Sequence, residues 1–112
     1  MAHTAPKIRT KTVSEVRNAA VSFSGKLDSG ELLTGTPIVT ELTTPDLTFT
    51  NIAVSSTILT IDGLSVPAGE AVQFKVSGGV ESTNYIIKIS CGTDSIPVQT
   101  LNGRITLYVE AD

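Results

Sequence analysis

The residue types that carry most enzymatic chemistry are scarce in this sequence. His3 is the only histidine and Cys91 the only cysteine, whereas catalytic triads and zinc sites need such residues in numbers. Neither a phosphate-binding glycine loop nor a dinucleotide fingerprint is present. We therefore predict no enzyme activity, no catalytic residues, no cofactor and no metal ligands.

Acidic residues are the remaining candidates for a metal site. Calcium needs several oxygen ligands that converge on one point, and the acidic residues fall mostly in separate predicted turns with no DxDxDG-like run. Turns at the same end of a sandwich can converge, which leaves the possibility open without defining a specific site. The residues concerned are Asp28, Glu31, Asp46, Asp62, Glu70 and Asp94.

The single cysteine has no partner for an intrachain disulfide, which argues against a small disulfide-stapled secreted module. Ile87 and Ile89 precede Cys91 at alternate positions, so the three residues share one face of a strand. We expect Cys91 to be a small core residue, because free cysteine is commonly buried.

The charge pattern directs attention to the N-terminus. The net charge is −3, so nothing in the chain attracts nucleic-acid phosphates. Lys7, Arg9 and Lys11 alternate and would share one face of a strand. They are our candidate partner contacts, in an arm of residues 1–12 that we expect to become ordered only against a partner. A solvated strand edge, protected by lysine from unwanted pairing, is the commoner meaning of such a stripe.

The composition also bears on surroundings and on interfaces. Charged residues make up only 17% of the chain, and hydroxyl-bearing surfaces are cheaper to desolvate than charged ones. This suits a packed interface, and equally a β protein whose solvent faces carry threonine. The start of the chain lacks an apolar signal segment, and no stretch approaches the ~20 apolar residues of a membrane span. We expect a soluble protein made in the cytoplasm, with no membrane partner.

Strand-forming residues recur throughout, separated at short intervals by Gly, Pro, Asp, Asn and Ser. This pattern predicts one all-β domain over residues 13–112, an immunoglobulin-like β-sandwich of about seven antiparallel strands. We expect the second strand to be bent or bulged around Gly35 and Pro37. The predicted strands cover residues 19–24, 32–42, 47–54, 57–61, 72–77, 85–91 and 104–109.

Alternation along these strands selects the residues expected in the core. Tyr85 follows a glycine-rich turn and is placed like a tyrosine corner, with its hydroxyl bonded back to residues 79–81. An ordinary half-buried tyrosine is the other interpretation. The predicted core consists of Val21, Phe23, Phe49, Val72, Phe74, Val76, Tyr85, Ile87, Ile89, Ile105, Leu107 and Val109.

The order of several segments is similar to that in a known family. They are residues 15–16 leading into 20–27, then 30–34, residues 47–54, residues 74–79 followed by 83–87, and residues 104–109. Through these segments the chain resembles the fiber-tail adaptors of tailed bacteriophages, which are short Ig-like virion proteins. The likeness runs over about residues 13–110. Phe23 stands where family members often have tryptophan, and Ser22 where they often have aspartate.

The resemblance implies a structural virion protein at the neck or tail that joins fibres or other components to the particle. Its partners would be other phage virion proteins and further copies of itself in a homo-oligomer. A capsid decoration or cement protein is the main alternative. A carbohydrate- or cell-binding module is a weaker one, because aromatic residues are only 4% of the chain and Tyr108 is its one plausible platform.

Overall fold

The computed structural model describes residues 10–43, 45–61 and 63–112, which form nine strands and one 3₁₀ turn. Residues 1–9, which include His3 and the predicted contacts Lys7 and Arg9, lie outside the described residues. The elements are β1 (Thr10–Thr12), β2 (Arg17–Ser22), η1 (Ser24–Lys26), β3 (Leu33–Glu41), β4 (Leu47–Val54), β5 (Leu59–Ile61), β6 (Leu64–Val66), β7 (Ala71–Gly78), β8 (Thr83–Thr93) and β9 (Thr100–Glu110).

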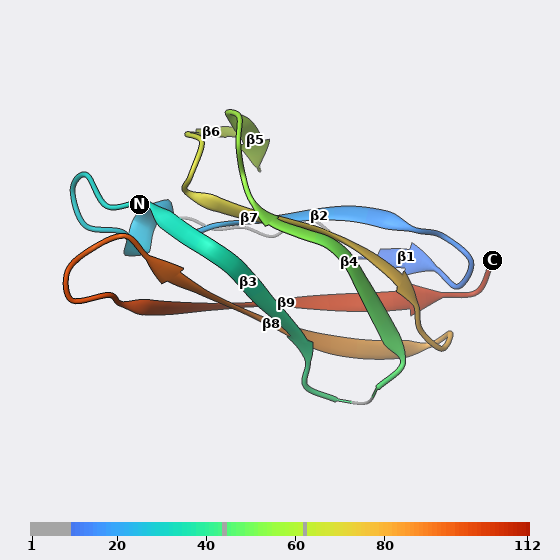
Figure 1. The fold of residues 1–112 in the computed structure, drawn as a ribbon. Coiled ribbons are helices and arrows are strands. Elements are labelled where there is room, and N and C mark those ends of the chain that lie inside the picture. The colour runs from blue at the N-terminus through green and yellow to red at the C-terminus, as the bar shows by residue number, and fades with distance from the viewer. Residues whose placement is uncertain (1–9, 44, 62) are drawn as a thin grey trace.

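The strands form two main sheets and a small hairpin (Figure 1). One sheet has the strand order β1-β9-β8-β3 and the other β2-β7-β4. All pairs are antiparallel except β1 with β9, which run parallel. The β5–β6 hairpin is a sheet of its own outside the two layers (Figure 1), and its Ile61 and Val66 pack with Ala71 of β7. The chain is therefore all-β, as the sequence predicts.

The alternation of apolar residues builds one core between the two main sheets. Eleven of the twelve predicted core residues belong to the buried cluster, together with Ala19, Leu33 and Cys91. The twelfth, Phe49, is partly buried and meets Phe74 edge-on at a ring-centroid distance of 5.7 Å. Burial raises the pKa of the Cys91 thiol, which keeps this core thiol protonated.

The bulge predicted in the second strand is present in β3. Its pairing with β8 shifts register between Thr34 and Ile38, and Gly35 there has φ +81°. Glycine adopts this backbone conformation without the steric cost that a side chain brings. β3 is an edge strand, where a bulge also limits pairing with other chains.

Two strands have no counterpart among the predicted ones. β6 lies where the sequence suggested a turn and a loop, and it completes the hairpin with β5. β1 lies inside the predicted arm of residues 1–12, and its three residues pair with Tyr108, Val109 and Glu110. The expected domain boundary after residue 12 is therefore wrong, because Thr10–Thr12 are already part of the sheet.

Tyr85 ties the loop before β8 to the rest of the domain. The side chain is fully buried. Its hydroxyl accepts a 2.7 Å hydrogen bond from the Val80 N–H and donates one of 3.0 Å to Asp46 Oδ2. The predicted bond back to residues 79–81 is confirmed. Burial raises the pKa of the Tyr85 phenol, so the hydroxyl keeps the proton that it donates.

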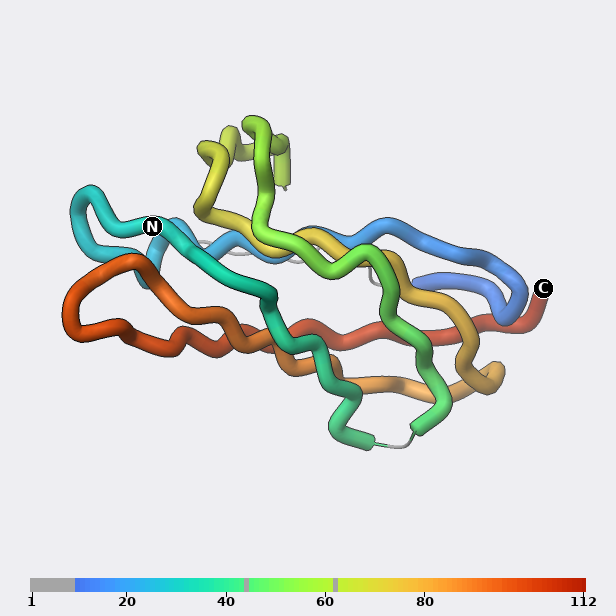
Figure 2. The backbone as a smooth tube through the Cα atoms, viewed as in Figure 1, coloured from blue at the N-terminus to red at the C-terminus, as the bar shows by residue number. Residues whose placement is uncertain are grey.

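The described part of the molecule is elongated, with extents of 44 × 27 × 22 Å. The β2–β3 and β8–β9 connections meet at one end, and the β1–β2 turn, the β7–β8 turn and the C-terminus gather at the other (Figure 2). Exposed apolar side chains lie at both ends, and the most exposed of them, Ile96, belongs to the β8–β9 connection.

Candidate interaction surface

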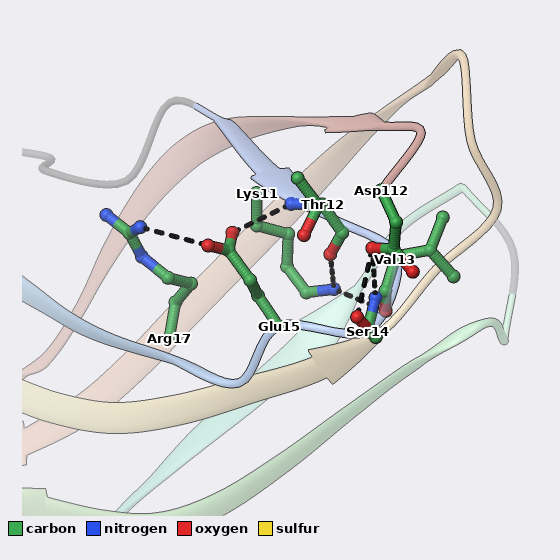
Figure 3. Close-up of polar contacts among 7 residues, drawn as sticks. All are labelled: Lys11, Thr12, Val13, Ser14, Glu15, Arg17 and Asp112. Atoms are coloured by element: carbon green, nitrogen blue, oxygen red, sulfur yellow. Dashed lines mark hydrogen bonds and ion pairs between the residues drawn. The ribbon is translucent and has the colours of Figure 1, made fainter.

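The structure removes Lys11 from the predicted contact surface. Its side chain is only 1% exposed. Its Nζ donates hydrogen bonds to the carbonyl oxygens of Thr12 at 2.7 Å and Val13 at 3.1 Å (Figure 3), and to that of Gly78 at 2.7 Å. An ammonium group has three donors, and all three are used. The prediction of Lys11 as a partner contact is wrong: it fastens β1 to the end of β7 in the opposite sheet.

Two carboxylates act on this ammonium, that of Glu15 in the turn after β1 and that of Asp112 beyond β9. Glu15 Oε1 accepts a bond from the Thr12 N–H at 2.8 Å, and Asp112 Oδ1 accepts from the N–H and hydroxyl of Ser14, both at 3.0 Å (Figure 3). Burial lowers the pKa of Lys11, while the charges of Glu15 and then Asp112 act in the opposite direction. The N-terminal residues that the structure describes thus form a structural lock.

An exposed apolar tip lies at the opposite end of the domain. Here we call the connections 23–32, 67–70 and 93–99 the loop end. In the β8–β9 connection Ile96 is 98% exposed and Val98 is 67% exposed, and Leu32 of the β2–β3 connection is 40% exposed. Apolar side chains grouped on a loop are more informative than scattered ones, because such exposure marks interaction sites.

Hydrogen bonds hold the backbone beneath this tip. Thr93 and Gln99 close the loop, with Thr93 N–H donating to Gln99 O at 3.0 Å and Gln99 N–H donating to Thr93 Oγ1 at 3.1 Å. Ser95 Oγ donates to Pro97 O at 3.0 Å. Leu32 N–H donates to Asp94 Oδ1, and Asp94 N–H to Leu32 O, both at 2.9 Å. The loop is therefore shaped before any partner arrives.

Glu31 is the centre of the polar network below the loop. It is 6% exposed and accepts bonds from the Asp28 N–H at 2.9 Å and from Gln99 Nε2 at 3.0 Å. Gln99 Nε2 also reaches Asp28 Oδ2 at 3.1 Å. The Asp28 N–H, followed by the Ser95 hydroxyl, holds the pKa of Glu31 below its usual range. A charged Glu31 thus links the β2–β3 and β8–β9 connections.

We expect Glu31→Gln to weaken the acid dependence of stability. A carboxylate whose pKa is lower in the folded state stabilises the fold above about pH 4.3, and this contribution is lost as the pH falls through the folded pKa. Wild-type protein should lose stability more steeply than the variant below that pH in urea titrations. Glu81→Gln removes an exposed carboxylate at the other end as a control. Parallel pH profiles for wild type and Glu31→Gln would contradict this role.

Sequence reasoning did not select Ile96 or Val98. The available signal was a pair of apolar residues flanking Pro97 within a segment rich in turn formers. Tyr108, the predicted aromatic platform for carbohydrate binding, is only partly exposed in the structure. The other predicted contacts, Lys7 and Arg9, lie outside the described residues.

The comparisons with known proteins supply no relative. No family model, no curated protein and no solved structure matches the chain. Within residues 10–43, 45–61 and 63–112, no group of three or more His, Cys, Asp and Glu side chains is placed to hold a metal ion. The same residues contain no helix long and apolar enough to cross a membrane.

Proposed function

We propose that the chain is an Ig-like structural protein of a tailed-bacteriophage virion, an adaptor at the neck or tail that joins fibres or other components. Strand order supports the Ig-like assignment. In such sandwiches strands B, E and D share one sheet and C, F and G the other. Here β2, β7 and β4 take the first set of places and β3, β8 and β9 the second, with the β5–β6 hairpin inserted between D and E.

The Tyr85 contacts support the same assignment. A tyrosine corner lies near the start of strand F and bonds back to the backbone a few residues upstream. Tyr85 is the third residue of β8, and its hydroxyl accepts a hydrogen bond from the Val80 N–H. The virion role itself rests on the resemblance of the sequence to fiber-tail adaptors, because a fold of this kind serves many functions.

The exposed apolar tip is the observation that favours assembly over catalysis. Ile96 and Val98 are large apolar side chains on a hydrogen-bonded loop. An immobilised loop loses little conformational freedom on binding, which favours affinity. A surface of this kind suits permanent contact with neighbouring proteins in a particle.

Imaging of phage particles with labelled protein tests the proposal. Label at a single vertex or along the tail supports an adaptor. Label distributed over the capsid faces would replace the adaptor with the capsid decoration protein that the sequence also suits. Particles without label, from cells that express the protein, would reject both virion roles. A glycan array with a Tyr108→Ala control then examines the carbohydrate-binding alternative.

A further inference from the structure

The charge of the loop end indicates what kind of occupant its apolar tip would bind. The loop end holds the carboxylates of Asp28, Glu31, Glu70 and Asp94 but only one cationic residue, Lys26. Two of these carboxylates, Asp28 and Asp94, are exposed beside the apolar tip. This surface complements an occupant that is both apolar and positively charged, since complementary potentials select partners.

The chain itself contains a segment with this chemistry. Residues 1–9 include Lys7 and Arg9 on either side of Ile8, and they contain no aspartate or glutamate. The rest of the chain is consequently more negative than its net charge of −3. We propose that the segment Lys7-Ile8-Arg9 of one copy binds the loop end of a second copy, with Ile96 as the central apolar contact.

Reach along the sheet makes this contact intermolecular. Thr10 pairs with Tyr108, whereas β9 begins at Thr100 beside the loop end. Eight residues of β9 span about 26 Å. Lys7 lies three residues before Thr10, so an extended backbone carries it only about 10 Å from that point. Neither Lys7 nor Arg9 reaches the loop end of its own chain.

The resulting interface is heterologous, with the loop end of one copy joined to the N-terminal segment of the next. Contacts of this type build a ring where the rotation closes and a filament where it does not. The lock around Lys11 fixes Thr10, the residue to which each segment is joined, because β1 is held to both β9 and the end of β7. Every copy therefore attaches its segment at the same point of the sandwich.

Sedimentation velocity on the purified full chain tests the inference with two complementary variants. Ile96→Ser disables the loop end. Because the Ile96 side chain is 98% exposed, this substitution leaves the core intact. Lys7→Glu combined with Arg9→Glu disables the segment. Each variant should weaken self-association about tenfold or more, the effect of losing a central interface residue. High salt near 1 M should also weaken it, because charges are then screened within about 3 Å.

A mixture of the two variants gives the sharpest outcome. The Ile96→Ser variant keeps an intact N-terminal segment, and the double variant keeps an intact loop end. The segment of the first can therefore bind the loop end of the second, so the mixture should form 1:1 pairs and nothing larger. Ile38→Ser, at a 65% exposed position on β3, is the matched control and should assemble like wild type. A monomeric wild type, association insensitive to both variants, or a mixture that fails to pair would overturn the inference.

The inference rests on the assembly role proposed above, but the two can fail separately. A chain found in particles that stays monomeric when purified would refute the contact between copies and leave the virion role standing. A self-associating chain that is absent from particles would refute the virion role alone.

Discussion

Replacing Lys11 with methionine should lower the free energy of unfolding by about 3 kcal/mol, because three partly buried carbonyls each lose a hydrogen bond at roughly 1 kcal/mol. Methionine keeps the length and the apolar stem of lysine, so packing changes little. The oxygens of Thr12, Val13 and Gly78 would remain without the donor that now reaches them. Urea unfolding followed by circular dichroism measures the loss.

Lys75→Met provides the matched control for this experiment. Lys75 is exposed on β7, and surface substitutions usually change stability by less than about 0.5 kcal/mol. Equal stability of the two variants would show that the lock contributes nothing net.

The alkaline pH dependence should report on the same ammonium. Burial lowers the pKa of Lys11, so in the alkaline interval between its folded and unfolded pKa values the unfolded chain binds more protons. Lys11 thus makes stability rise with pH in that interval. The stability difference between wild type and Lys11→Met should grow as the pH rises there. A difference that stays constant across that interval would contradict this linkage.

Gly78→Ala should cost about 2–4 kcal/mol, through a positive φ and a steric clash together. Gly78 has φ +85°, and a Cβ there would lie 2.7 Å from the backbone oxygen of Asp46. Relief of that clash must move either the β7–β8 turn or the loop before β4. It would also displace the Gly78 carbonyl that Lys11 holds.

Gly30→Ala separates the cost of the positive φ from the cost of the steric clash in the same unfolding assay. Gly30 has φ +80° and nothing within 4 Å of the position that a Cβ would take. The substitution there costs only the conformational penalty of about 1–2 kcal/mol. If both alanine variants lost the same stability, the close approach at Gly78 would have no energetic weight.

The features predicted from sequence are those that depend on local pattern. Alternation places Val72, Phe74 and Val76 inward whatever the partner strand, because successive side chains point to opposite faces. The bulge in β3 follows in the same way from Gly35 and Pro37, which restrict the backbone locally. These signals recover the interior of the sandwich.

The missed features depend on partners far away in the sequence. β1 is three residues long and pairs with residues about a hundred positions later, which no local period reveals. Lys11 looks like an ordinary surface lysine until the carbonyl of Gly78 is brought beside it from the other sheet. β6 was missed because Val66 is followed by proline and glycine, which are stronger signals for a loop.

The candidate surface was hidden for a different reason. A hydrophobic residue in a turn predicts burial as readily as exposure, so Ile96 gives no sign of its 98% exposure in the sequence alone. Only the folded backbone shows that the hydrogen bonds of Thr93, Ser95 and Gln99 turn it outward.

The parallel pairing of β1 with β9 decides how the domain responds to pulling. The polypeptide enters the first strand at Thr10 and leaves the last strand at Glu110, at opposite ends of the paired segment. A tensile force between the N-terminus and the C-terminus therefore acts along the two strands and loads their hydrogen bonds in shear. Bonds loaded in shear must break together instead of one after another. A chain linked through both termini would resist mechanical extension at this short pair of strands before the rest of the sandwich bears any load.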